Sequence, residues 1–304
     1  MTDVVSRKMR RVIGWETKPL YSCHDLRENG YGPIEAYYRH GGDPCIVRFE
    51  LANCRWFGAS GLAYSSSSLH PYVQTLIDYS KGRCGEYKGS FLEFYWKVWK
   101  PENLAEYFGL STENAHPLLA NSPAIHNFFP WSPVRRLLYL ENQEWKKDLE
   151  RFGLCDEKSS PARSCGPKST SFGEARFGHL INVYESIKVN GYCDRTSPRV
   201  RYSKQHIVGN CLVRGRDVRI VVANGQHRAA ALVAHGQIVA PIIVHCKNGR
   251  GPNIVRREDV NVWPMVQMGL FREDDAVSIF DRIFDAIPPE SLRAGTRGFR
   301  EFEC

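Results

Sequence analysis

A strand-to-helix bend at residues 221–236 constrains the fold of this chain most strongly. The sequence V-V-A-N-G-Q-H-R-A-A-A-L-V-A-H-G predicts a buried strand that breaks at Asn224 and Gly225 and passes directly into a short helix. The first turn of a helix leaves several amide donors without partners and carries the positive end of the helix dipole, so it favours a bound anion such as phosphate. Gly225 allows close backbone approach, and His227 and Arg228 add side-chain donors. The pattern predicts an anion site, with an ordinary solvated turn as the alternative, and it matches neither the P-loop nor the dinucleotide fingerprint.

Helical and extended segments flank this bend. Apolar residues at helical spacing predict a helix over 177–190 that stops at Gly191. Gly236 is expected just after the end of the short helix. Residues 238–244 are expected to form a buried or edge strand and not a central one, because Pro241 removes a ladder donor. Short strands are expected before the bend, over 199–203, 206–208, 212–213 and 219–223. A Gly/Asn turn is expected at 209–210, between the second and third of them.

This order of elements, with the N-G-Q-H-R turn, resembles the ParB/sulfiredoxin superfamily domain over residues 174–246. The resemblance implies an α+β fold with a small mixed sheet and helices, and a turn that binds nucleotide phosphates. Sulfiredoxins have a reactive cysteine where this chain has Gln226, which argues against reduction of sulfinic acids. ParB proteins usually have Gly-Glu-Arg-Arg at this turn and a following helix-turn-helix, for which the segment after Cys246 is too short and too poor in helices. The turn is nearest to the D-G-H-H-R of the kinase-like members, from which it departs by Asn224 in place of Asp.

The resemblance to the kinase-like members implies a nucleotide-dependent phosphotransferase that acts on a hydroxyl group of a small metabolite and uses ATP or CTP with Mg²⁺. Arg228 would stabilise charge during transfer, and Glu174 matches by position the acidic residue that orients the acceptor, with Arg176 as an accessory group. An ordinary residue of a helical N-terminal turn is the alternative for Glu174. The rival function is a ParB-like nucleotide-binding or hydrolysing switch that engages nucleic acid or a protein partner. The residues expected to bind phosphate are Asn224, Gly225, Gln226, His227 and Arg228.

Composition along the chain predicts two domains. Residues 156–172 are rich in Ser, Pro, Gly and Lys and predict a linker between a mainly helical, aromatic-rich α+β domain at 1–155 and the nucleotide-binding domain, with a helical extension, at 173–304. Lys168 in this linker is a candidate charge on a lid over the nucleotide. Trp96 and Trp99 could stack on a ligand, but their helical spacing favours the core. A strand is expected at 45–51, and helices at 71–82, 91–99, 134–152 and 274–287.

Composition also limits the class of protein. Of the 304 residues, 42% are hydrophobic and 24% charged, which is typical of a globular protein. The chain has no apolar run long enough for a bilayer and no signal-peptide core at its start, so a cytoplasmic protein with no membrane partner is expected. Ten cysteines without C-x-x-C pairs predict reduced thiols and no metal site. The net charge of +8, with a basic cluster over 195–219, indicates a solvated basic face and only weakly a nucleic-acid groove.

Overall fold

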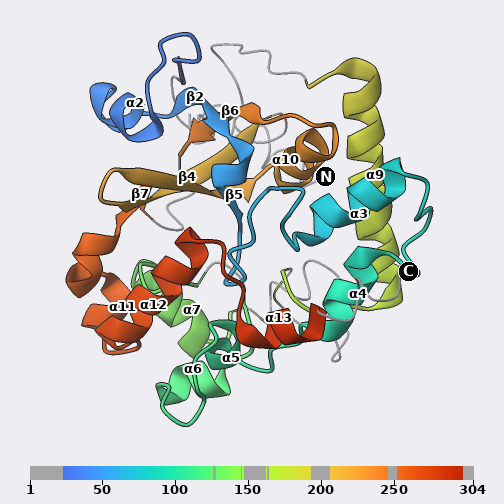
Figure 1. Cartoon of the computed structure of the whole chain (residues 1–304). Coiled ribbons are helices and arrows are strands. Elements are labelled where there is room, and N and C mark those ends of the chain that lie inside the picture. Colours follow the sequence, from blue (N-terminus) through green and yellow to red (C-terminus); the bar gives the residue numbers. More distant parts are fainter. Residues whose placement is uncertain are drawn as a thin grey trace, which may run out of the picture.

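A mixed β-sheet forms the centre of the protein (Figure 1). The computed structural model describes residues 23–125, 128–144, 146, 162, 164–192, 206–245 and 252–296. Within these residues the sheet has seven strands in the order β1-β2-β6-β4-β5-β3, and β7 also pairs with β4. The strands are β1 (His24–Asp25), β2 (Cys45–Glu50), β3 (Cys54–Trp56), β4 (Ile207–Arg214), β5 (Asp217–Asn224), β6 (Val239–Val244) and β7 (Ile254–Arg256).

Strands from both halves of the sequence pair with one another in this sheet. Strand β2 pairs antiparallel with β6, and β3 pairs parallel with β5. One hydrophobic core accordingly contains residues from both sides of the segment 156–172. The two regions that flank the expected linker therefore share one sheet and one core.

Two groups of helices surround the sheet. One group, α3 (Pro71–Ser80), α9 (Thr170–Asn190) and α10 (Gln226–Ala234), lies together on the right in Figure 1, where α10 packs against both α3 and α9. The other group lies below the sheet in the same view. Its members are α4 (Phe91–Val98), α5 (Leu104–Tyr107), α6 (Pro117–Asn121), α7 (Arg135–Glu141), α11 (Pro264–Gln267), α12 (Glu273–Phe284) and α13 (Glu290–Thr296). Helix α2 (Pro33–Arg39) packs on β2, and two short 3₁₀ helices are η1 (Leu51–Asn53) and η3 (Arg257–Val262).

The expected helix over 177–190 is confirmed, but it begins seven residues earlier, at Thr170. The side chain of Ser169 accepts a hydrogen bond from the amide of Phe172 and so caps this first turn, while Gly191, at φ +71°, ends the helix. The last three residues of the expected linker are therefore helical.

Two expectations for the strands are wrong. The Gly/Asn turn at 209–210 lies inside β4, because Gly209 packs flat against Ile220 and Val221 of β5, where a side chain would collide. The chain reverses instead at Gly215, which has a φ of +59°. Strand β6 is central, since its ladder with β4 starts at Ile242 and so does not require an amide donor from Pro241 toward β4. The expected strand at 199–203 lies outside the described residues.

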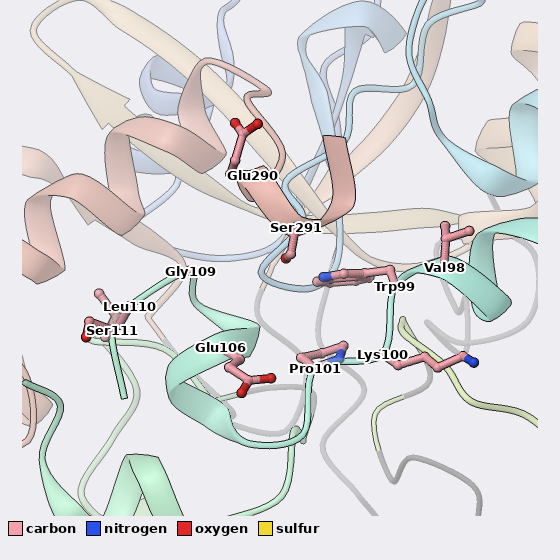
Figure 2. Close-up of a pocket in the computed structure, with 10 residues that line it drawn as sticks. All are labelled: Val98, Trp99, Lys100, Pro101, Glu106, Gly109, Leu110, Ser111, Glu290 and Ser291. Atoms are coloured by element: carbon pink, nitrogen blue, oxygen red, sulfur yellow. The ribbon is translucent and has the colours of Figure 1, made fainter. Parts of the chain in front are cut away.

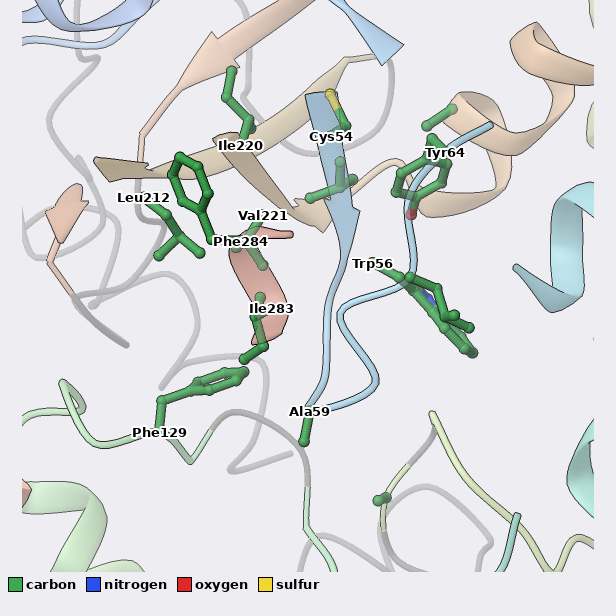
Figure 3. Packing of buried hydrophobic residues seen from close by; sticks show 14 of the residues in the cluster. Cys54, Trp56, Ala59, Tyr64, Phe129, Leu212, Ile220, Val221, Ile283 and Phe284 are labelled. Carbon is green, nitrogen blue, oxygen red and sulfur yellow. The ribbon is translucent and has the colours of Figure 1, made fainter. Parts of the chain in front are cut away.

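A buried arginine joins α12 to the sheet. Arg55 of β3 is 4% exposed and donates hydrogen bonds to the carbonyls of Ile283 and Phe284, at 3.0 and 2.7 Å. These carbonyls belong to the last turn of α12, where a cation offsets the negative end of the helix dipole. Figure 3 shows Ile283 and Phe284 near Ile220 and other sheet residues in the same core. Trp96 and Trp99 are 2% and 1% exposed, which confirms that they belong to the core.

Candidate functional site

The bend before α10 has the geometry that its sequence predicts. Gly225 adopts φ +80° and ψ +20°, a left-handed conformation that favours glycine, and the first intrahelical bond of α10 runs from the Ala229 amide to the Gly225 carbonyl at 2.9 Å. No side-chain cap forms at this end of α10 among the described residues. The bend follows an irregularity in the β4–β5 ladder at Val208 and Gly209, and such bulges re-aim the chain beside them. The first turn of α10 therefore presents backbone amides without a capping side chain.

One side of this bend is closed by the start of β4. A Cβ atom on Gly225 would lie 2.9 Å from both the His206 carbonyl oxygen and the Ile207 Cα. The guanidinium of Arg228 donates to the same His206 carbonyl at 3.0 Å and is partly buried against the start of β4. Burial lowers the pKa of Arg228, although an arginine remains charged at neutral pH. Arg228 thus keeps a positive charge beside the first turn of α10.

Three aromatic rings from three helices meet at this turn. The ring of His227 stacks on Tyr72 of α3, with centroids 4.7 Å apart and planes at 16°, and meets His179 of α9 edge-on, also at 4.7 Å. The Nε2 atom of His227 is buried and has no hydrogen-bond partner within the described part of the chain. A buried polar atom in this state is commonly satisfied by a water molecule or a ligand.

The electrostatic environment of these histidines is positive. Burial lowers the pKa of His227 far below its ordinary value, and Arg176, His179 and Arg228 lower it further. Burial, Arg176 and Arg228 likewise lower the pKa of His179. Both imidazoles are therefore neutral at pH 7, and the arginines around them create a potential that favours an anion.

Most of the predicted site residues come together here. Asn224 ends β5, Gly225 forms the bend, and His227 and Arg228 lie in the first turn of α10. The guanidinium of Arg176 of α9 lies over the Phe172 ring and is close enough to act electrostatically on His227. The side chain of Gln226 instead turns toward the core, where its Oε1 accepts a hydrogen bond from Trp56 Nε1 at 3.4 Å. Gln226 therefore offers only its backbone amide to the candidate anion site.

The structure does not bring Glu174 and Lys168 to this cluster. Glu174 lies near Tyr87, whose pKa it helps to raise, and residues two apart on a helix, such as Glu174 and Arg176, do not share a face. Lys168 donates to the Ala162 carbonyl at 2.7 Å and lies over the Phe172 ring. Neither side chain is positioned at the first turn of α10.

Sequence reasoning missed Tyr72 and His179. Tyr72 belongs to a helix more than 150 positions upstream, and no local pattern connects it with the bend. His179 follows Arg176 by three residues, a spacing that places both on one side of a predicted helix. This spacing is the sequence signal that could have identified His179 as a member of the site.

A separate cavity of about 400 Å³ lies between the end of α4, α5 and the start of α13 (Figure 2). Its lining includes Trp99, Glu106 and Glu290, but none of the predicted site residues. Glu106 accepts a hydrogen bond from the Glu102 amide, and Glu290 pairs with Arg293. The lining carries two carboxylates against one basic side chain, Lys100, so its charge does not favour a phosphate.

Comparisons with protein-family models, curated proteins and solved structures find no match for this chain. The resemblance to the ParB/sulfiredoxin superfamily therefore stays a prediction, whereas the mixed α+β architecture is confirmed. Within the described residues, no helix has the length and apolar composition needed to cross a membrane.

Proposed function

We propose that the first turn of α10 binds the phosphates of a nucleoside triphosphate, and that the protein transfers the terminal phosphoryl group to a hydroxyl of a small metabolite. The observation that carries the proposal is the convergence of an uncapped, glycine-preceded helix N-terminus with Arg228 and Arg176, next to neutral histidines. Backbone amides and arginines are the groups that bind phosphate oxygens most strongly in proteins.

Each group has a distinct part in this proposal. The amides of the first turn hold phosphate oxygens, and Gly225 allows the left-handed bend that presents them, with its missing Cβ leaving room for the start of β4. Arg228 and Arg176 offset the charge that spreads over the phosphoryl oxygens during transfer. His227 can donate from one ring nitrogen in its neutral form.

Magnesium is not assigned to a protein site. The described residues contain no group of three or more His, Cys, Asp or Glu side chains that could hold a metal ion. Asn224 offers one oxygen near the bend, which alone does not make a metal site. No step of the proposal depends on a protein-bound metal.

The test is a transfer assay with γ-labelled ATP and γ-labelled CTP, Mg²⁺ and a panel of hydroxylated metabolites. We expect a labelled product with the unmodified protein and none above background with Arg228→Ala. The matched control is Arg48→Ala, an exposed arginine of β2 that pairs with Glu28, and it should retain the activity. Hydrolysis without product, stimulated by nucleic acid or by a protein, would instead support a ParB-like switch. The absence of both reactions would contradict the proposal.

A further inference from the structure

Helix α9 brings His179 into contact with the first turn of α10 and carries Arg176 close enough to act on it electrostatically. At 3.6 residues per turn, His179 lies about 60° from Arg176 around the helix axis, whereas Glu174 lies about 140° from His179 and about 160° from Arg176. His179 contacts the ring of His227, and Arg176 acts electrostatically on the same ring. Glu174 is on the other flank of the helix, near Tyr87.

His179 combines access with proximity to the phosphate-binding turn. Its side chain is exposed, so a substrate can reach it, while its ring lies 4.7 Å from that of His227, the second residue of α10. Among the described residues, Arg176 on its own helix and Arg228 on α10 act on it electrostatically, and its ring meets that of His227, with Tyr72 of α3 behind His227. Arg176 and Arg228, together with burial, lower the pKa of His179, so its imidazole keeps a lone pair at pH 7.

We propose that His179, and not Glu174, is the base that accepts the proton of the attacking hydroxyl. This inference rests on the proposed function. The acceptor O–H donates its proton to a ring nitrogen of His179 while the acceptor oxygen bonds to the γ-phosphorus. The bond from that phosphorus to the bridging oxygen breaks, and its electron pair leaves with the nucleoside diphosphate. The imidazolium then returns the proton to solvent.

The charges favour this sequence of events. Without ligand, Arg176 and Arg228 disfavour a third positive charge at His179. Bound phosphates bring negative charge to the same place, which raises the pKa of a nearby histidine. His179 therefore becomes a better proton acceptor only when the nucleotide is present. Water can replace the acceptor, so slow hydrolysis should depend on the same residue.

The test compares His179→Gln, a neutral side chain that cannot take the proton, with Glu174→Gln as the matched control. Titration calorimetry with a non-hydrolysable ATP or CTP analogue measures binding, and turnover of ATP and CTP with Mg²⁺ measures transfer to water and to the metabolite panel. We expect His179→Gln to keep its Kd within about threefold and to lose about 100-fold or more of kcat, as removal of a general base does. Glu174→Gln should keep both values within about threefold.

A second readout does not require turnover. The imidazole signals of His179, followed by NMR against pH, should show a pKa below the ordinary histidine value in the free protein and a higher pKa with the bound analogue. An unchanged His179 pKa, or a kcat lost in Glu174→Gln and kept in His179→Gln, would overturn the assignment while leaving nucleotide binding intact. Analogue binding without any turnover would overturn it as well. Failure of the unmodified protein to bind either analogue would instead refute the proposed function itself.

Discussion

Acid should destabilise this protein through His70, a fully buried residue that precedes α3. Its ring lies 4.9 Å from Trp56 and 4.3 Å from Tyr64, and neither ring nitrogen has a hydrogen-bond partner among the described residues. Burial lowers the pKa of His70 to about 3, against about 6.5 in an unfolded chain. Below pH 6.5 His70 therefore binds a proton in the unfolded state, whereas it stays neutral in the folded state until the pH approaches 3.

The sign and size of the effect follow from this difference in pKa. The stabilising contribution of neutral His70 is present above pH 6.5 and is lost progressively between pH 6.5 and pH 3. Between pH 7 and pH 5 the loss amounts to about 2 kcal/mol in the free energy of unfolding. Other groups, including His227, add to the total, so the contribution of His70 must be isolated by substitution.

Urea unfolding at pH 7 and pH 5, on the unmodified protein and on His70→Phe, provides this comparison. Phenylalanine keeps an aromatic ring between Trp56 and Tyr64 but cannot be protonated. The variant should lose about 2 kcal/mol less than the unmodified protein when the pH falls from 7 to 5. Equal losses in the two proteins would refute the assignment, whatever the stability of the variant at pH 7.

Three further predictions concern the backbone. Gly225→Ala should lower the free energy of unfolding by about 1 to 3 kcal/mol, because φ is +80° there and the new Cβ would press on the His206 carbonyl; a neutral result in urea unfolding would contradict this. Arg55→Met should cost about 3 kcal/mol, since it leaves buried carbonyls at the end of α12 without donors, and a thermal unfolding temperature equal to that of the unmodified protein would disprove that role. Ser169→Ala should cost about 1 kcal/mol through loss of the α9 cap, measured by urea unfolding against Ser186→Ala, an exposed residue in the interior of the same helix that should change little.

Local chemistry explains what could be predicted from the sequence. The bend at Gly225 follows from an Asn-Gly pair between an apolar run and a helical pattern, and α3, α4 and α12 follow from prolines, caps and apolar spacing. These signals lie within a few residues of the structure that they specify. The backbone conformation of the bend is therefore readable without knowledge of the rest of the chain.

Contacts between distant segments explain which features could not be predicted from the sequence. Nothing near Cys54 indicates that its strand pairs with Ile220, and nothing near Tyr72 indicates that it stacks on His227. The prediction of a turn at Gly209 was wrong for the same reason, since a glycine is required there by the close packing of β5 against β4. A Ser/Pro/Gly-rich composition likewise suggested a separation between two regions that contribute strands to one sheet.

The central claim is that the first turn of α10 binds nucleotide phosphates with the help of Arg228. Titration calorimetry of ATP and CTP, with Mg²⁺, into the unmodified protein and into Arg228→Ala tests it most directly, with Arg48→Ala as the control. We expect micromolar to millimolar binding of at least one nucleotide and a Kd that rises about tenfold or more in Arg228→Ala, since charge-assisted hydrogen bonds contribute about 1.5 to 3 kcal/mol. Arg48→Ala should bind as the unmodified protein does. Binding that is unchanged in Arg228→Ala, or no binding of either nucleotide to the unmodified protein, would contradict the claim.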